Sequence, residues 1–471
     1  MATSKRAARK KRRLVVVANR GPLRSEVSGG RRRWVRSAGG LVAALDPVLR
    51  QRGGVWVSAE EAEPHSEVPV EGPELDYDTR AVSLSRTRQQ GFYLGVSNAV
   101  LWPLLHSFPP TARVGEAPWD DYVHANRAFV DEVLASSTQR DLVWIQDYHL
   151  MLMPGMLRRK RGKARIGWFC HVPWPNPDLF EILPWRREIL EGLLGADIVG
   201  FHTDVYAQNF LECVERLTDL GVDHARRTVR HGDRITRAVA APIGIPVEEI
   251  QAIAADPEVN RQAEELRRLV GGRRIILGVD RLDYTKGIPE RILGWERVLR
   301  ARRAARNELV LVQIMVPSRT AVQAYAALKD EVDRLVGHVN GRFGSTGRVP
   351  IHYLYRNLDQ RTLFAHYRAA DVALVTPLRD GMNLVAQEYV ASRVDDDGAL
   401  VLSEFAGAAE YLHEAVLVNP YDIGGLAAGL EEALGLPRRE LKRRMRAMRG
   451  EVARLDVHRW ADGFIQSVEH G

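Results

Sequence analysis

The feature that most constrains the fold is a repeated alternation of short apolar, β-branched runs with longer amphipathic stretches. The short runs have the composition of buried strands, and the stretches between them have the spacing of helices. This alternation is typical of parallel sheets covered by helices, because parallel strands need long crossover connections. The predicted strands are residues 14–18, 142–146, 166–170 and 198–201, followed by 275–279, 309–316, 351–355, 372–375, 400–403 and 416–418.

The length of 471 residues fits two such domains, since a domain typically takes roughly 100–200 residues. The segment Ala241-Pro-Ile-Gly-Ile-Pro246 interrupts the pattern of strands and helices with two prolines and a glycine. We therefore predict an α/β protein with an N-terminal domain over residues 14–243 and a C-terminal domain over residues 244–471. The last helix could pack back on the N-terminal domain.

The charge of the chain is concentrated at its N-terminus. The formal net charge is +7, and residues 1–13 hold seven Lys or Arg and no acidic residue, so the rest of the chain is neutral. We interpret residues 1–13 as a disordered basic tail. A neutral body argues against a nucleic-acid partner, whose recognition needs a basic surface.

Two further features favour a cytoplasmic location. The sequence has no window of ~18 apolar residues that could span a membrane, and the basic tail is not followed by the apolar core of a secretory signal. Cys170 and Cys213 are the only cysteines, too few for a disulfide framework or a zinc cluster. We therefore expect a cytoplasmic protein without a membrane partner.

In open α/β sheets, ligands bind at the carboxyl ends of the strands, so the residues that follow each predicted strand are the candidates for a site. In the first half, Asp147 follows one predicted strand and His171 follows the next. Gly39 and Gly40 open a predicted helix, where backbone N–H groups can approach a phosphate, although a plain tight turn explains them equally well. Tyr93 and Trp102 could pack on a sugar face or fasten a loop to the core.

In the second half, cationic and acidic residues follow the predicted strands. Arg281 and Lys286 lie in the loop predicted after residues 275–279, where they could clamp a diphosphate or simply be solvated. Arg319 follows residues 309–316 in a Pro-Ser-Arg turn. Asp380 lies in a turn that is predicted to start a helix, and Glu388, two turns into that helix, is suited to accept hydrogen bonds from a ribose diol.

Several enzyme classes lack their motifs in this chain. The sequence has no HExxH, no CxxC, no Walker-type GxxxxGK[ST] and no GxGxxG dinucleotide motif. Cations, glycine turns and acidic residues at strand ends instead favour a nucleotide-sugar diphosphate on the C-terminal domain. A second, phosphorylated ligand would lie on the N-terminal domain, across an interdomain cleft.

These motifs together resemble a known family. NRxP, SAGGL, YxxxSNxxLWP, DYHL, HxPWP, RLDYxKG, PSR, PLRDGMNLVAxEYV and LSEFAGAAEYL occur in an order and spacing similar to those of the trehalose-6-phosphate synthases, the retaining glycosyltransferases of family 20. The resemblance covers residues 14–465. It implies a GT-B fold, in which two Rossmann-like domains with parallel sheets face an interdomain cleft. It also implies metal-independent transfer of glucose, without a cofactor, from a nucleoside diphosphate glucose to glucose 6-phosphate, by a homodimer or homotetramer.

The resemblance also implies a role for each matching residue. Asp147 would meet the acceptor hydroxyls, and Arg281 and Lys286 would stabilise the departing diphosphate. His171 and Asp380 would bind the donor sugar, and Glu388 the ribose. The other positions that would hold the acceptor are Arg20, Tyr93, Trp102 and Arg319. The other positions that would meet the donor are Gly39, Gly40, Leu358, Gly381, Met382, Asn383, Leu384 and Val385.

The chain departs from the family pattern near the acceptor site. Ala59 stands where the family usually has an aromatic residue, and Leu105-His-Ser-Phe-Pro109 resembles the related glucosylglycerol-phosphate synthases, whose acceptor is glycerol 3-phosphate. Gln387 stands where many bacterial members have Lys. Uracil, guanine and adenine all stay open as the donor base, because the family reads the base largely through backbone contacts. A catalytically silent sugar-phosphate sensor is the alternative from a different class.

Overall fold

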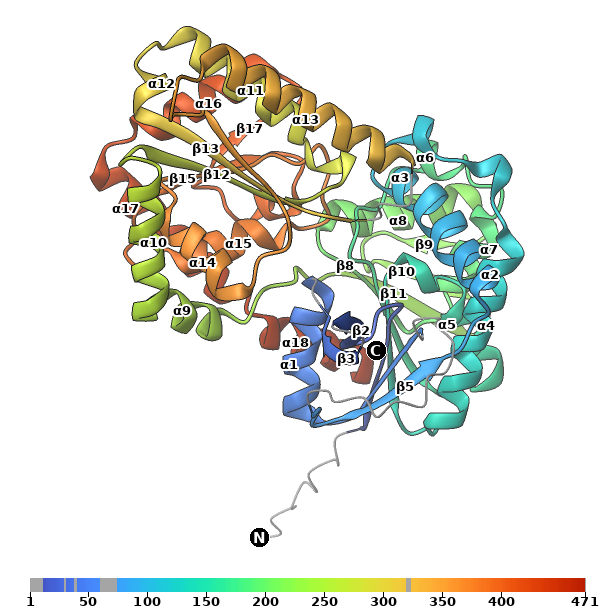
Figure 1. The fold of residues 1–471 in the computed structure, drawn as a ribbon. Helices are drawn as coiled ribbons and strands as arrows, with labels where there is room; N and C mark the ends of the chain where they lie inside the picture. The colour runs from blue at the N-terminus through green and yellow to red at the C-terminus, as the bar shows by residue number, and fades with distance from the viewer. Residues whose placement is uncertain (1–11, 29–30, 38–39, 60–73, 319–322, 471) are drawn as a thin grey trace. The chain divides into compact units, whose positions relative to one another are not determined.

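The computed structural model describes residues 12–28, 31–37, 40–59, 74–318 and 323–470. The chain divides into two compact units (Figure 1). Unit 1 consists of Met1–Ala241 and Ala461–Gly471, and unit 2 of Pro242–Trp460. Residues 1–11 of the predicted basic tail, and Gly39 and Arg319 of the predicted site, lie outside the described residues.

Unit 1 is built on a mainly parallel sheet in the order β5-β4-β1-β6-β7-β8-β11-β10-β9, in which β10 pairs antiparallel with both of its neighbours, β11 and β9. The apolar runs predicted in this half are its central strands, and two of them end one residue away from the predicted position. The strands are β1 (Leu14–Val17), β4 (Val55–Ala59), β5 (Asp78–Val82), β6 (Leu142–Gln146), β7 (Arg165–Phe169), β8 (Ile198–Phe201), β9 (Val222–Asp223), β10 (Thr228–His231) and β11 (Arg234–Ala240). A separate hairpin pairs β2 (Leu23–Ser28) with β3 (Arg31–Arg36).

The last helix, α18 (Val457–His470), contributes its final residues to unit 1. Its Phe464 ring lies 5.1 Å from the ring of Trp144 and 5.3 Å from that of Phe169. A Cβ on Gly200 would come within 2.4 Å of the Phe464 ring, so this strand needs glycine where the helix crosses it. The other longer helices of unit 1 are α1 (Gly40–Arg52), α4 (Trp119–Ser136), α5 (Met153–Lys160), α7 (Arg186–Leu193) and α8 (Asp204–Leu217).

The segment that carries Tyr93 and Trp102 is helical. It forms a π-helix, η1 (Gln90–Leu101), that continues into the short helix α3 (Trp102–Leu105). π-helical segments are rare and are frequently found at functional sites. The buried Asn98 side chain donates a hydrogen bond of 2.7 Å to the Tyr93 carbonyl and supports the widened backbone.

Unit 2 is built on a fully parallel sheet in the order β14-β13-β12-β15-β16-β17. Its strands match the predicted runs closely, because both faces of this sheet are covered and the strands are continuously apolar. The strands are β12 (Arg274–Arg281), β13 (Leu309–Val316), β14 (Ile351–Tyr355), β15 (Val372–Val375), β16 (Ala399–Ser403) and β17 (Val416–Val418). The longer helices are α9 (Val247–Ala255), α10 (Pro257–Leu269), α11 (Ile288–Ala301), α13 (Gln323–Phe343), α14 (Gln360–Ala369), α15 (Leu384–Ser392), α16 (Ile423–Gly435) and α17 (Arg438–Arg454).

The core of unit 2 is an apolar cluster between its sheet and helices α11, α13 and α16, and it includes the fully buried Trp295. Among the described residues, none of the helices is long and apolar enough to cross a membrane.

Candidate active site

In unit 1, the central strands end in register, so the residues that follow them share one edge of the sheet. Val17 of β1 pairs with Ile145 of β6, and Gln146 pairs with Phe169 of β7. The next residues along these strands bring Asp147 and His171 to the same edge, as the sequence predicted. The His171 N–H donates a hydrogen bond of 3.2 Å to Asp147 Oδ1, which joins the two directly.

Asp147 has a backbone conformation that side chains rarely adopt. Its φ of 70° and ψ of 171° fall in a region populated almost exclusively by glycine. The neighbouring strand holds it there, because the Asp147 N–H donates to Phe169 O at 2.7 Å and its carbonyl accepts from the Trp168 indole at 3.2 Å. Strained residues of this kind cluster at functional sites, which supports a functional role for this carboxylate.

His171 is positioned as an uncharged hydrogen-bonding group. Its Nε2 lies 2.9 Å from the amide oxygen of Gln146. Burial, and to a lesser degree the neighbouring His202, lower the pKa of His171 well below its usual value. The imidazole is therefore neutral at physiological pH, suited to a sugar hydroxyl.

The predicted acceptor residues that the structure describes lie beside this edge. Arg20 follows β1 and is exposed, and its Nη2 donates to the Tyr93 hydroxyl at 3.1 Å. The Trp56 indole donates to the Arg20 carbonyl at 3.1 Å and so holds that loop. Ala59, the last residue of β4, donates its N–H to Asn19 O at 3.3 Å, which places it next to Arg20.

The remaining predicted unit 1 residues differ in exposure. Trp102 is only 5% exposed, with its ring 4.0 Å from that of His106 and 5.9 Å from that of Tyr148. Most of the Trp102 side chain is therefore packed against neighbouring residues of unit 1. Gly40 is exposed and is the first residue of α1, as the pattern predicted.

In unit 2, three predicted residues meet in one cluster. Lys286 Nζ lies 2.6 Å from Asp380 Oδ2, and the Asn383 amide donates to the same oxygen at 3.0 Å. The Lys286 side chain is 11% exposed and that of Asp380 is 14% exposed, so the charge pair is largely shielded from water. Arg281 was expected in a loop, but it is the last residue of β12 and is exposed.

The turn before α15 is closely packed and ends in a helix N-terminus. Gly381 and Met382 are buried, and a Cβ on Gly407 would come within 2.1 Å of Gly381 O. Asn383 has a φ of 77° and caps α15, accepting a hydrogen bond of 3.0 Å from Ala386 N. The first N–H groups of the helix follow, at Leu384 and Val385. The N–H groups at a helix start of this kind favour a negatively charged group.

Glu388 lies little more than one turn into α15, which begins at Leu384, and not two turns as the sequence analysis expected. The difference arises because Asn383 takes a left-handed conformation and delays the start of the helix. The Tyr367 hydroxyl donates to Glu388 Oε2 at 3.0 Å. Burial raises the pKa of Glu388 to about 7, against the smaller lowering effect of the Tyr367 hydrogen bond.

A supporting cluster beneath this site was missed by the sequence analysis. The buried Arg291 pairs with Asp280, donates to Thr376 Oγ1 at 3.1 Å and donates to the Lys286 carbonyl at 3.3 Å. It thereby ties the Lys286 backbone to the loop after β15. An acidic residue inside an apolar strand, as Asp280 is in β12, is a signal that could have found this cluster, because buried carboxylates need a partner.

Leu358 lies in the connection between β14 and α14 and is partly buried. The next residue, Asp359, caps α14 by accepting from Thr362 N at 3.0 Å. In the part of the chain that the structure describes, no group of three or more His, Cys, Asp or Glu side chains could hold a metal ion.

Two Rossmann-like units with polar residues at the carboxyl ends of their strands are the architecture of the GT-B class of glycosyltransferase. In unit 2, the Lys286–Asp380 pair lies beside the start of α15. The chain belongs to glycosyltransferase family 20, whose sequence profile matches residues 12–470. This confirms the resemblance and the fold class predicted from the sequence.

Relatives of known name are similar over almost the whole chain. Trehalose-6-phosphate synthase from Mycobacterium bovis is 45% identical over 472 residues, which cover 96% of this chain and 94% of that protein. The protein of the same name from Mycolicibacterium smegmatis is 45% identical over 463 residues, covering 96% and 92%.

Solved structures are similar in fold as well. An α,α-trehalose-phosphate synthase (UDP-forming) from Burkholderia xenovorans in complex with glucose-6-phosphate has a TM-score of 0.89 and 33% identity, covering 97% of this chain and 100% of that chain. A structure from E. coli bound with UDP-2-fluoro glucose has a TM-score of 0.87 and 34% identity, covering 97% and 99%.

Proposed function

We propose that this chain is a retaining glucosyltransferase that forms α,α-trehalose 6-phosphate from a nucleoside diphosphate glucose and glucose 6-phosphate. The observation that carries the proposal is the identity of 45% over 96% of the chain to trehalose-6-phosphate synthases, together with the Lys286–Asp380–Asn383 cluster beside the start of α15. Among the possible donors, the UDP-forming neighbours favour UDP-glucose.

On the acceptor side, Asp147 binds sugar hydroxyls, and the exposed cation Arg20 binds the phosphate with the help of Tyr93. The Arg20–Tyr93 hydrogen bond of 3.1 Å supports this pairing, because it orients the guanidinium before the ligand arrives. Trp102 shapes this site through its packing, and Arg319 supplies a second cation. The strained backbone of Asp147 supports a functional role, because the strain fixes the direction in which its carboxylate points.

On the donor side, the diphosphate lies against the N–H groups of Leu384 and Val385, and the family resemblance assigns Gly39 and Gly40 to the donor phosphates as well. Gly381, Met382 and Asn383 shape the turn that faces the diphosphate and sugar. Asp380 and the neutral His171 bind glucose hydroxyls. Glu388 accepts from the ribose diol, and the Leu358 backbone meets the base.

The reaction follows from this arrangement of charges. The bond between the glucose anomeric carbon and the diphosphate breaks, and the acceptor hydroxyl oxygen bonds to that carbon on the same face. The acceptor proton passes to an oxygen of the departing diphosphate. Arg281 and Lys286 stabilise the negative charge that develops there, so we propose that the transfer needs no metal ion or cofactor.

The other parts of the proposal concern the protein in the cell. We propose a cytoplasmic homodimer or homotetramer with small-molecule substrates and neither a nucleic-acid nor a membrane partner. Size-exclusion chromatography with light scattering measures the assembly directly, and a monomer at micromolar concentration would contradict this part.

The proposal is tested by a matrix of donors and acceptors. Purified protein is incubated with UDP-, GDP- or ADP-glucose and with glucose 6-phosphate or glycerol 3-phosphate, while nucleoside diphosphate release and product mass are followed. We expect release with glucose 6-phosphate and a disaccharide phosphate as product.

Two other outcomes would overturn the proposal. Release with glycerol 3-phosphate alone would make the chain a glucosylglycerol-phosphate synthase and point to Ala59 as the reason. The similarity of this chain to trehalose-6-phosphate synthases favours glucose 6-phosphate over glycerol 3-phosphate as the acceptor. No release of nucleoside diphosphate with any pair of donor and acceptor would favour a sugar-phosphate sensor.

A further inference from the structure

The Glu388 carboxylate is held by a residue from a neighbouring helix. Tyr367 lies on α14, which packs against α15, and it is only 1% exposed. Its hydroxyl donates to Glu388 Oε2 at 3.0 Å. A phenol that donates to one carboxylate oxygen fixes the rotation of the whole group, and Oε1 is then aimed by the same contact. The hydrogen bond therefore sets the direction in which Glu388 can accept from a diol.

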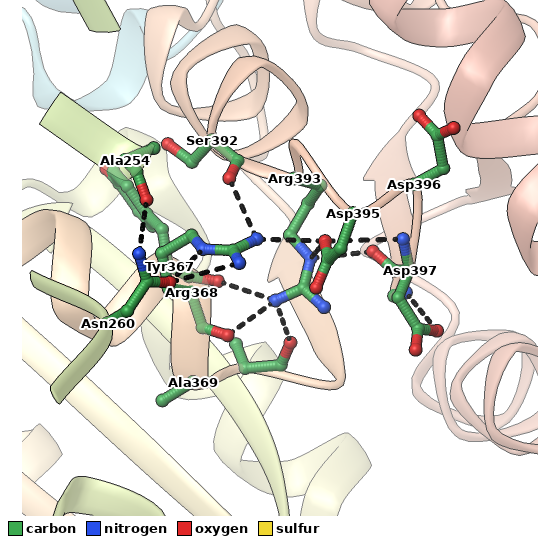
Figure 2. A network of polar contacts seen from close by, with 12 residues as sticks. Ala254, Asn260, Tyr367, Arg368, Ala369, Ser392, Arg393, Asp395, Asp396 and Asp397 are labelled. Carbon is green, nitrogen blue, oxygen red and sulfur yellow. Dashed lines mark hydrogen bonds and ion pairs between the residues drawn. The ribbon is translucent and has the colours of Figure 1, made fainter. Parts of the chain in front are cut away.

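A second side chain fixes the helix that carries Tyr367. Arg393 follows the last residue of α15 and is 1% exposed. Its Nη1 donates to three carbonyls at the end of α14: Tyr367 O at 3.1 Å, Arg368 O at 2.7 Å and Ala370 O at 3.0 Å. Figure 2 shows the guanidinium reaching across to Tyr367 and Arg368. The last carbonyls of a helix otherwise lack partners, so one buried cation satisfies the end of α14.

The same guanidinium is anchored on its other side. Arg393 Nε donates to Asp397 O at 2.6 Å in the loop after α15. The adjacent Arg368 is tied to Asp395 at 2.9 Å and to Asn260 Oδ1 of α10 at 3.2 Å (Figure 2). The ends of α14 and α15 are thus locked together, and the distance between Tyr367 and Glu388 is set by packing from both helices.

We propose that Tyr367 and Arg393 are positioning residues of the donor site, which hold the Glu388 carboxylate in the orientation that accepts both hydroxyls of the donor ribose. This inference rests on the proposed function, in which Glu388 binds the ribose. Tyr367 acts on Glu388 directly, and Arg393 acts through the end of α14. Neither side chain touches the reacting atoms.

The titratable groups around this pair are few. Glu388 and Tyr367 act on each other, and Asp280 of β12 acts on Tyr367, with its own charge paired to Arg291. The hydrogen bond from Tyr367 stabilises the ionised form of Glu388. Its loss therefore moves the titration of Glu388 to higher pH, an effect that a purely structural tyrosine would not produce.

The chain offers a matched control for Tyr367. Tyr389 is the neighbour of Glu388 on α15 and is 0% exposed, and its hydroxyl makes no hydrogen bond within the described residues. Tyr367→Phe and Tyr389→Phe each remove one buried hydroxyl from the same region. Only Tyr367→Phe removes a contact to Glu388.

The experiment measures donor KM, acceptor KM and kcat for the full-length enzyme, with UDP-glucose as the donor, between pH 5.5 and about 8.5, a window that brackets the raised pKa of Glu388. For Tyr367→Phe we expect donor KM to rise by roughly 10-fold, the scale of one hydrogen bond to a charged group, with acceptor KM unchanged. The pH at which donor KM begins to rise moves upward. Tyr389→Phe keeps the wild-type profile.

Glu388→Ala separates this inference from the proposed function. If Glu388→Ala leaves donor KM unchanged, the proposed ribose contact itself is wrong. If Glu388→Ala raises donor KM while Tyr367→Phe matches Tyr389→Phe, the ribose contact stands and the positioning inference is overturned.

Arg393→Lys tests the second positioning residue while keeping its positive charge. Lysine has a single donor nitrogen and cannot reach the α14 carbonyls and Asp397 O at the same time, so donor KM should rise several-fold with acceptor KM unchanged. An unchanged donor KM, or an equal rise of both KM values, would remove Arg393 from the inference.

Discussion

The backbone strain at Asp147 makes a prediction with an unusual sign. At an ordinary position, replacing a residue with glycine lowers stability relative to alanine by about 0.5–1 kcal/mol, because glycine loses more conformational freedom on folding. At a φ of 70° and ψ of 171°, a Cβ costs on the order of 1–3 kcal/mol, and glycine avoids that cost. Asp147→Gly should therefore be more stable than Asp147→Ala by roughly 0.5–2 kcal/mol.

The comparison isolates the strain because both variants lose the same carboxylate. Each forfeits the hydrogen bond from the His171 N–H, so that contribution cancels in the difference. Both should also lose most of their turnover with glucose 6-phosphate. The assay is urea unfolding followed by tryptophan fluorescence, with the free energies of unfolding compared between the two variants.

Asp131 supplies the matched control. It is exposed on the helix α4, where alanine should be favoured over glycine by about 1 kcal/mol. The order of glycine and alanine is thus expected to invert between the two positions. An Asp147→Ala variant as stable as Asp147→Gly, or more stable, would refute the strain argument and with it the reason given for a directed carboxylate.

Four further outcomes are expected. Arg281→Ala or Lys286→Ala should each lower kcat by on the order of 10², whereas activity near wild type would remove that residue from leaving-group stabilisation. Arg319→Ala should raise the KM for glucose 6-phosphate, and an unchanged acceptor KM would contradict its role. Because burial raises the pKa of Glu388 from 4.5 to about 7, donor KM should rise as the pH falls through about 7, and a donor KM that does not change with pH would show that ionised Glu388 does not bind the ribose. The contribution of this group to the free energy of unfolding is full below pH 4.5 and is lost as the pH rises through about 7. Dialysis against EDTA should leave turnover intact, and its loss with recovery on adding Mg²⁺ would argue for a metal-assisted reaction.

Much of the fold could be predicted because most strands of the two sheets are continuous apolar runs. The runs that became β6, β8, β13, β14, β15 and β17 end where the apolar pattern ends. The strands β5 and β9 were missed because they are short edge strands, and β5 in particular is polar and largely exposed, so it lacks an apolar signature. The start of α15 was placed too early because the left-handed turn at Asn383 carries no periodicity.

For the candidate site too, part could be predicted from the sequence and part could not. By itself, the sequence determined which residue types follow each strand. This was enough to predict Asp147 and His171 at one edge of the sheet in unit 1, because parallel strands present their carboxyl ends at one edge, and to predict Lys286 and Asp380 after strands of unit 2. The family motifs added the chemistry expected of each position.

Only the tertiary structure decided how those residues are held. Tyr367 and Glu388 are 21 residues apart on different helices, and nothing in their spacing predicts a hydrogen bond. Asp280 and Arg291 became partners because burial excludes water from both charges. The positive φ of Asp147 is held by two groups of the neighbouring strand, the Phe169 carbonyl and the Trp168 indole. Local pattern determines which groups reach the site, whereas orientation depends on contacts between segments that are distant in the chain.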